Sequence, residues 1–229
     1  MTPLLRLALP LLATTFAGLP IAAADPTGTL QGTIEGLGKG PFLVYVDQIP
    51  GAKYPAQDPA PVLGQKNNTY VPHILAVVVG SKVELRSSDP ELHNVYAWAQ
   101  SLGRVVFNVT IPPNSPPSVQ QLNQVGTIKL TCNVHREMLA FIVVLQNPFF
   151  ALTGKTQTEF TIANIPAGLR EVRVWGERLE PEQLARKYAV EIKPGQVTPV
   201  TLGPIRTATA RGLSSGTYPR GPLTVCIVE

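Results

Sequence analysis

Glycine and proline divide this chain into short segments, and this division limits it to a fold built mainly from strands. The 229 residues include 23 prolines and 19 glycines, which favour turns and interrupt long helices. Between them lie runs of five to seven residues that alternate polar and apolar side chains or are β-branched and apolar. In the first two thirds of the chain these runs are residues 29–34, 42–46, 74–79, 82–86, 105–111, 127–131 and 141–145. The pattern predicts an all-β sandwich.

The pattern of polar and apolar residues changes after Pro148, where shorter strand patterns follow one another. We therefore predict a first β domain over residues 25–148, a small β module over residues 149–205, and a weakly ordered tail rich in Gly, Ser, Thr and Arg over residues 206–229. A module of this size builds a poor core alone, so we expect it to pack against the first domain, and residues 29–34 are a candidate strand to pair with it. The strand patterns within the module are residues 159–162, 172–175, 188–192 and 197–202.

Residues 1–24 have the features of an export signal. Arg6 is their only charged residue, residues 7–17 form an apolar stretch, and three alanines at residues 22–24 offer the small side chains that a signal peptidase requires. A membrane anchor is disfavoured because the apolar stretch is short and is broken by Pro10. We predict a signal peptide, a periplasmic or secreted protein and no membrane span.

The charge of the chain is only mildly basic. Nineteen Lys and Arg residues against 15 Asp and Glu residues give a formal net charge of +4, and the basic residues form no run or stripe suited to nucleic acid. The sequence also lacks a Gly-x-Ser-x-Gly nucleophile motif, a phosphate-binding loop and a His-Glu-x-x-His zinc motif. We therefore predict neither a nucleic-acid partner nor an enzyme.

One short segment gathers three metal donors between two strand patterns. Cys132 offers a thiolate, His135 an imidazole and Met138 a thioether, and His93 lies earlier, just past the strand pattern at residues 82–86. Without the signal, the chain has one methionine and three histidines, and the methionine and two of the histidines belong to this set. Structural roles in the core are the alternative for Cys132 and Met138. The clustering favours a metal site.

The types of donor in this set point to one metal. Two imidazoles, one soft thiolate and one weak thioether suit a single copper ion that cycles between Cu(I) and Cu(II) with little rearrangement. Soft sulfur argues against calcium and magnesium, and zinc accepts Cys and His but has little use for a thioether. The predicted copper ligands are His93, Cys132, His135 and Met138.

The Cys-x-x-His-x-x-Met spacing and the earlier His-Asn pair resemble the ligand loops of cupredoxins such as amicyanin and plastocyanin, and the resemblance covers residues 65–146. It implies a Greek-key β-sandwich, the same four ligands, and a role for Asn94 in tying the first ligand's loop to the cysteine loop. These relatives usually have proline before the second histidine, and amicyanin also has proline after it. Here Val134 and Arg136 occupy those positions, which changes the surroundings of the site but removes no ligand.

The segment from residue 152 to residue 202 resembles the transthyretin-like, carboxypeptidase-regulatory-like module that often follows such cupredoxins. Residues 160–162, 165–168 and 172–175 carry the match. Related sequences often have histidine after the tryptophan of the last of these, where this chain has Gly176. The resemblance therefore implies a structural or docking β-sandwich without metal or catalytic residues.

Three other interpretations involve cysteine or histidine residues. Cys226 is the only possible disulfide partner of Cys132, but a bridge would remove the thiolate from the cluster. His73 is either an ordinary structural histidine or a neighbour, or even an extra ligand, of the site. A nucleophile and base pair of Cys132 and His135 is disfavoured because the two are close in sequence and no third group orients them.

Together these features predict an exported blue-copper protein that carries single electrons to a redox partner protein. The resemblance implies that the electron passes by way of His135, and Pro112, Pro113 and Leu139 are candidates for an apolar docking face around it. A copper storage or delivery module without redox turnover is one alternative, and a structural β protein of the cell envelope is the other. Reversible one-electron cycling favours the electron carrier, and rapid handover of Cu(I) to an acceptor favours storage or delivery. Failure to bind copper leaves the structural protein.

Overall fold

The structure is a computed structural model that describes residues 26–37 and 40–207. Strands account for nearly all of its regular structure, in agreement with the all-β prediction, and α1 is a single short helix among these residues. The predicted signal peptide and Cys226 lie outside the described residues. In the part of the chain that the structure describes, no helix is long and apolar enough to cross a membrane.

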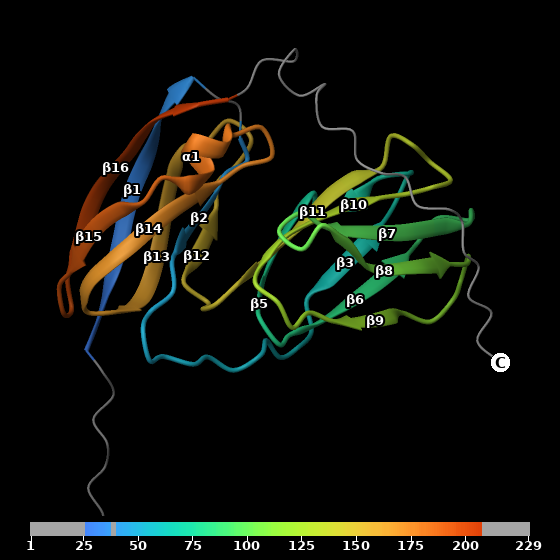
Figure 1. Cartoon of the computed structure of the whole chain (residues 1–229), viewed down its shortest axis with the longest axis horizontal. Helices are drawn as coiled ribbons and strands as arrows, with labels where there is room; N and C mark the ends of the chain where they lie inside the picture. Colours follow the sequence, from blue (N-terminus) through green and yellow to red (C-terminus); the bar gives the residue numbers. More distant parts are fainter. Residues whose placement is uncertain (1–25, 38–39, 208–229) are drawn as a thin grey trace, which may run out of the picture.

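Nine strands from the middle of the chain form a first sandwich (Figure 1). One sheet has the order β5-β11-β10-β7-β8 and the other the order β4-β3-β6-β9. Leucine, isoleucine and valine side chains from both sheets fill the space between them. The strands are β3 (Val62–Gln65), β4 (Tyr70–Val71), β5 (Ile74–Val78), β6 (Lys82–Ser87), β7 (His93–Ala99), β8 (Arg104–Ile111), β9 (Ser118–Gln121), β10 (Gly126–Thr131) and β11 (Leu139–Leu145).

The remaining elements form a second sandwich beside the first (Figure 1). Its sheets have the orders β13-β1-β16 and β12-β2-β14-β15, with a separate apolar core between them. The four strand patterns predicted after Pro148 correspond to four of these strands. The elements are β1 (Thr27–Leu37), β2 (Leu43–Val46), β12 (Phe150–Leu152), β13 (Glu159–Pro166), β14 (Gly168–Trp175), α1 (Pro181–Ala185), β15 (Tyr188–Ile192) and β16 (Val197–Arg206).

The two N-terminal strands lie in the second sandwich, although the predicted first domain, residues 25–148, includes them. β1 pairs antiparallel with β13 and parallel with β16, and β2 pairs with β12 and β14. Gly32 on β1 lies opposite Val200, whose carbonyl oxygen would be 2.1 Å from an added Cβ, so only glycine permits this close approach. Alternation along a strand shows which side chains face a core, but it does not show which core.

An apolar interface joins the two sandwiches. The outer face of the sheet that contains β11 packs against the outer face of the sheet that contains β2 and β14, and the buried side chains of this cluster are Leu43, Ile74, Phe141, Val143, Leu145 and Trp175. Asn147, which is fully buried, lies where the chain passes from one sandwich to the other. Its side-chain amide donates to the carbonyl groups of Val46 and Asp47, at 3.0 and 2.9 Å. These contacts fix the two sandwiches against each other.

A polar bridge adds to this interface and makes its stability depend on pH. His73 Nε2 donates to Glu177 Oε2 at 2.7 Å. The hydrogen bond to Glu177 raises the pKa of His73 above 6.5, against burial and nearby Lys155, which lower it. The same bond lowers the pKa of Glu177 below 4.5, although burial opposes it. The bridge therefore contributes fully between these values. It is lost as the pH falls through the lowered pKa of Glu177 or rises through the raised pKa of His73.

We expect the variant His73→Gln to be less stable than the wild type by about 0.2–1 kcal/mol at about pH 5.5, the range for partly exposed ion pairs. The difference should shrink towards about pH 9, where His73 of the wild type is neutral. Urea unfolding of both proteins at the two pH values measures it. A difference that is constant with pH would mean that the charge of His73 contributes nothing.

Candidate metal centre

Three of the four predicted ligands meet at one end of the first sandwich. His93 is the first residue of β7, Cys132 follows the last residue of β10, and His135 lies in the turn before β11. The Nδ1 atoms of the two histidines are 3.1 Å apart, and Cys132 Sγ is 3.9 Å from His135 Nδ1. The three donor atoms all lie within 4.8 Å of one another. Strands β7 and β10 are paired neighbours, so the sheet itself brings the segments together.

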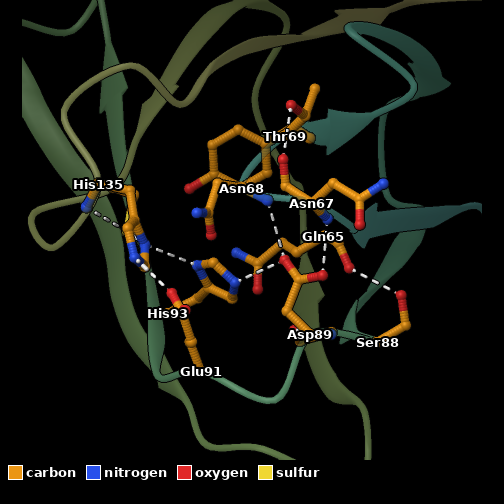
Figure 2. A network of polar contacts seen from close by, with 12 residues as sticks. Gln65, Asn67, Asn68, Thr69, Ser88, Asp89, Glu91, His93 and His135 are labelled. Atoms are coloured by element: carbon orange, nitrogen blue, oxygen red, sulfur yellow. Dashed lines mark hydrogen bonds and ion pairs between the residues drawn. The ribbon is translucent and has the colours of Figure 1, made fainter.

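The Nε2 atom of each imidazole in this cluster makes a hydrogen bond to a carboxylate (Figure 2). His93 Nε2 lies 2.9 Å from Asp89 Oδ2, and His135 Nε2 lies 3.0 Å from Glu91 Oε2. Since a carboxylate only accepts hydrogen bonds, each Nε2 carries the proton, and in a neutral ring Nδ1 is then a free lone pair. The Nδ1 lone pairs of the two histidines and the sulfur of Cys132 therefore face a common point. A cation bound at that point would stabilise these three electron-rich atoms.

Asp89 is itself held firmly by the backbone of the turn before β4. Its carboxylate is buried and accepts hydrogen bonds from the amides of Asn67 and Asn68, at 2.6 and 3.1 Å (Figure 2). Burial alone would raise the pKa of this carboxyl, but the two backbone hydrogen bonds and the one from His93 outweigh it and hold the pKa below its usual value. A charged carboxylate thus fixes the orientation of His93 in a site from which water is largely excluded.

Met138 lies next to the three donors in the same core. Its side chain is 1% exposed and belongs to the buried cluster that contains Cys132. Its amide donates to His135 O at 3.1 Å, which closes a tight turn between the two residues. In the preceding residues of the loop, His135 N donates to Cys132 Sγ at 3.5 Å, where it stabilises a thiolate. The Cys-x-x-His-x-x-Met spacing therefore forms one compact loop.

The three donor atoms lie close to the positions that a single ion requires. An ion about 2.0 Å from each nitrogen and about 2.3 Å from sulfur, with the donors spread evenly around it, separates nitrogen from nitrogen by about 3.5 Å and nitrogen from sulfur by about 3.7 Å. The Nδ1 atoms of His93 and His135 are 3.1 Å apart, and Cys132 Sγ is 3.9 Å from His135 Nδ1. The widest pair of donors lies within 4.8 Å, so binding an ion draws His93 and Cys132 together by about 1 Å. The donor set of two imidazoles and a thiolate suits copper or zinc, and the buried thioether favours copper.

Two polar side chains brace the strands that carry the donors. The Tyr70 hydroxyl lies 3.0 Å from the carbonyl oxygen of Asn94 and 3.1 Å from that of Thr131, the residues next to two of the donors. The Asn94 side chain accepts a hydrogen bond from Asn133 N at 3.3 Å, which confirms that it ties the two loops together. Burial first and Cys132 second raise the pKa of Tyr70, so its hydroxyl stays protonated and remains a donor.

Sequence reasoning did not identify Asp89, Tyr70 or Glu91 as parts of this site. Asp89 belongs to a Ser-Asp pair that fits the cupredoxin resemblance, but no sequence pattern assigned it a role beside His93. Gln65 was also missed. Its buried side chain is directed towards His93 in Figure 2, and its amide lies close enough to Tyr70 to affect that pKa, yet makes no hydrogen bond of normal geometry.

The surface near His135 differs from the simple apolar face that was expected. The His135 side chain is 16% exposed, and the exposed carboxylate of Glu91 covers its outer nitrogen (Figure 2). Pro112 is exposed, whereas Leu139 is only partly so. His73 takes no part in the cluster and is a structural histidine, the first of the two interpretations given above, because its ring nitrogens bind Leu139 O and Glu177.

Comparisons with solved structures find matches that cover less than half of this chain. A reduced variant of amicyanin with tyrosine in place of a tryptophan is 25% identical, over 38% of this chain and 84% of its own length, with a TM-score of 0.34. Amicyanin from Paracoccus versutus is 18% identical over 38% and 83%, with a TM-score of 0.33. A purple cupredoxin from Nitrosopumilus maritimus is 21% identical over 36% and 95%, with a TM-score of 0.31.

These similarities take up most of each smaller protein and less than half of this chain. No model of a known protein family matches the chain, and a search of curated proteins also finds no match. The second sandwich thus has no identified relative in these comparisons, and its resemblance to transthyretin-like modules stays a prediction.

The contact between Asp89 and His93 leads to a testable expectation for metal affinity. In the variant Asp89→Asn, the neutral amide no longer favours the protonated Nε2 of His93 and turns an N–H towards at least one of three donors. We expect copper affinity to fall about 10–100-fold, as for other residues that orient a ligand. Competition with a chromophoric chelator measures this. Glu91→Gln, which changes an exposed partner of His135, is the control and should have a smaller effect.

Proposed function

We propose that this protein is a one-electron carrier of the cupredoxin type, with a single copper ion held by His93, Cys132, His135 and Met138. The observation that carries the proposal is the convergence of two Nδ1 lone pairs and one sulfur within 4.8 Å, with the outer nitrogen of each ring fixed by a carboxylate. Copper in such a site would supply reversible one-electron chemistry between Cu(I) and Cu(II).

The surrounding residues favour electron transfer over storage or delivery. His93 is 0% exposed and Cys132 is 4% exposed, and they lie at the ends of the paired strands β7 and β10. A ligand set that is fixed before binding changes little between oxidation states, which keeps the reorganisation small. Delivery would instead require an incoming ligand to reach the site, and only the His135 edge is open to solvent. Residues 1–24 support the further proposal that the protein acts outside the cytoplasm, in the periplasm or as a secreted protein.

A titration of the metal-free protein with copper tests the proposal. We expect one equivalent of Cu(II) to produce an intense visible thiolate-to-copper band that disappears on reduction and returns on reoxidation over many cycles. Binding of Cu(I) with rapid transfer to a chelator and no stable Cu(II) form would favour delivery. Failure to bind copper would overturn both.

Met138 provides a further test of the proposed ligand set. We expect Met138→Leu to keep copper and to raise the reduction potential, because a weak thioether stabilises Cu(II) and leucine of similar volume preserves the packing. Cyclic voltammetry of both proteins measures the change. An unchanged or lower potential would show that Met138 is a core residue and not a donor to the metal.

A further inference from the structure

His73 connects the second sandwich to the strand that follows Met138. Its Nε2 lies 2.7 Å from Glu177 Oε2, in the turn after β14, and its Nδ1 lies 3.0 Å from Leu139 O, at the first residue of β11. Its own carbonyl oxygen accepts a hydrogen bond from Phe141 N at 2.9 Å. One residue therefore contacts the start of β11 twice and the other sandwich once.

Both ring nitrogens of His73 face groups that only accept hydrogen bonds. A carbonyl oxygen at one nitrogen and a carboxylate at the other are satisfied together only when each nitrogen carries a proton. The His73 ring is therefore an imidazolium, held in that form by Glu177, although Lys155 acts against it. Lys129 and Arg178 are the other charged groups near Glu177, and both favour its carboxylate form.

The segment that His73 contacts also contains Met138. On one side, Met138 N donates to His135 O at 3.1 Å; on the other, the next residue, Leu139, accepts from His73. The backbone around Met138 is thus held between the metal loop and the interface. A shift of the Leu139 carbonyl would move the buried side chain of Met138 relative to Cys132, because both lie in one closely packed core.

Apolar contacts make this connection rigid. The ring of Phe141 lies edge-on to His73 with centroids 5.8 Å apart, and its centroid is 5.2 Å from that of Trp175. Trp175 is the last residue of β14 and precedes Glu177 by two residues. The second sandwich therefore contacts the His73 and β11 unit through a buried aromatic side chain as well as through a carboxylate.

We propose that Glu177 and His73 are positioning residues through which the second sandwich sets the placement of Met138 in the metal centre. The proposal rests on the function proposed above, since it gives Met138 a role as metal donor. The second sandwich is then a structural part of the centre, although the donor cluster found among the described residues contains none of its residues. Removing the charge of Glu177 frees the His73 ring and relaxes the strand that begins at Leu139.

The test follows Met138 directly and does not require copper. The chain contains only two methionines, Met1 and Met138, so a methyl-labelled protein has a simple methionine spectrum in which Met138→Leu assigns the signal. We expect the Met138 methyl resonance of the metal-free protein to shift in Glu177→Gln and to return most of the way in Glu177→Asp. The matched control is Glu171→Gln, which removes an equal charge from the exposed ion pair with Lys187 on the same sandwich. It should leave the resonance in place.

Loading with copper separates the failure of this inference from the failure of the proposed function. We expect the copper-loaded Glu177→Gln protein to show a shifted reduction potential and an altered ratio of its visible bands, and Glu171→Gln to match the wild type. An unmoved methyl signal in Glu177→Gln, or an equal shift in both variants, overturns the positioning role whether or not copper binds. A Met138 signal that moves as expected in a protein that forms no copper–thiolate band supports the mechanical connection and overturns the electron-carrier function. Circular dichroism of each variant confirms that it is folded. If Glu177→Gln is not, His73→Gln removes the other half of the same contact and should also displace the Met138 signal.

Discussion

The variant Cys132→Ser is expected to lose the thiolate-to-copper absorption completely and to remain folded. Cys132 is the only cysteine among the described residues, and its Sγ lies 3.9 Å from His135 Nδ1 and 3.5 Å from His135 N. A serine hydroxyl is too weakly acidic to become an anion there and is too hard a donor for Cu(I). The affinity for copper should therefore fall by more than the roughly 10–100-fold expected for a residue that only orients a ligand.

Cys226→Ser is the matched control, because it removes the other cysteine by the same change. It should keep both the band and the stoichiometry of one copper ion. Visible absorption and metal analysis of the two variants, beside circular dichroism, measure these outcomes. A band that survives in Cys132→Ser, or is lost in Cys226→Ser, would assign the thiolate to a different residue and remove the basis of the proposed centre.

The candidate centre was predictable from sequence where chemistry and short spacing coincide. Cys132, His135 and Met138 lie within seven residues, so one loop between two strands brings them together without knowledge of the fold. His93 lies 39 residues before Cys132, and it was found from its place after the strand pattern at residues 82–86 and from the His-Asn pair that resembles the cupredoxin ligand. Its position at the start of β7 was not foreseen, because no strand was predicted over His93–Ala99.

The groups that orient the donors could not be predicted in the same way. Asp89 contacts His93 only because the amides of Asn67 and Asn68, on a separate turn, hold its carboxylate. An exposed acidic residue and a buried one that fixes a histidine have the same appearance in a sequence. Glu177 is a stronger case, since its contact with His73 spans 104 residues and two sandwiches. Such contacts depend on tertiary packing and leave no local pattern.

The fold class followed from local patterns, but the membership of the strands in the two sandwiches did not. The segments at residues 82–86, 127–131 and 141–145 correspond to β6, β10 and β11. β1 alternates just as well, yet its partners are β13 and β16, more than a hundred residues later in the chain. Pairings between strands so distant in sequence are decided by the complete set of apolar faces, of which each strand shows only one.

The pairing of β1 and β2 predicts a large effect of cutting the chain after Pro148. Every strand that pairs with β1 or β2 among the described residues follows that point, so the fragment retains neither β13 and β16 nor β12 and β14. The apolar side chains of Leu30 and Leu43, both 0% exposed in the whole protein, lose their core. We expect residues 27–46 to lose all native structure, because isolated strands are not stable in water.

Hydrogen exchange of the backbone amides measures this loss. In the whole protein the amides of β1 and β2 should be protected. In the fragment of residues 25–148 they should exchange as in an unfolded chain, while β6, β7, β10 and β11 remain protected. A matched fragment of residues 60–147, which omits β1 and β2, should have the same unfolding midpoint as the longer fragment. Persistent protection of β1, or a clearly higher midpoint of the longer fragment, would contradict the strand pairing described above.

Both fragments should still bind one copper ion, because His93, Cys132, His135 and Met138 all lie in the first sandwich. Their stability should nevertheless be lower than that of the whole protein, since Phe141 and its apolar neighbours on the outer face of β11 become exposed. Both fragments also lack Glu177, so their Met138 methyl resonance should be displaced in the same direction as in Glu177→Gln. A Met138 signal at the wild-type position in a folded fragment would mean that the first sandwich alone determines the geometry of its metal centre.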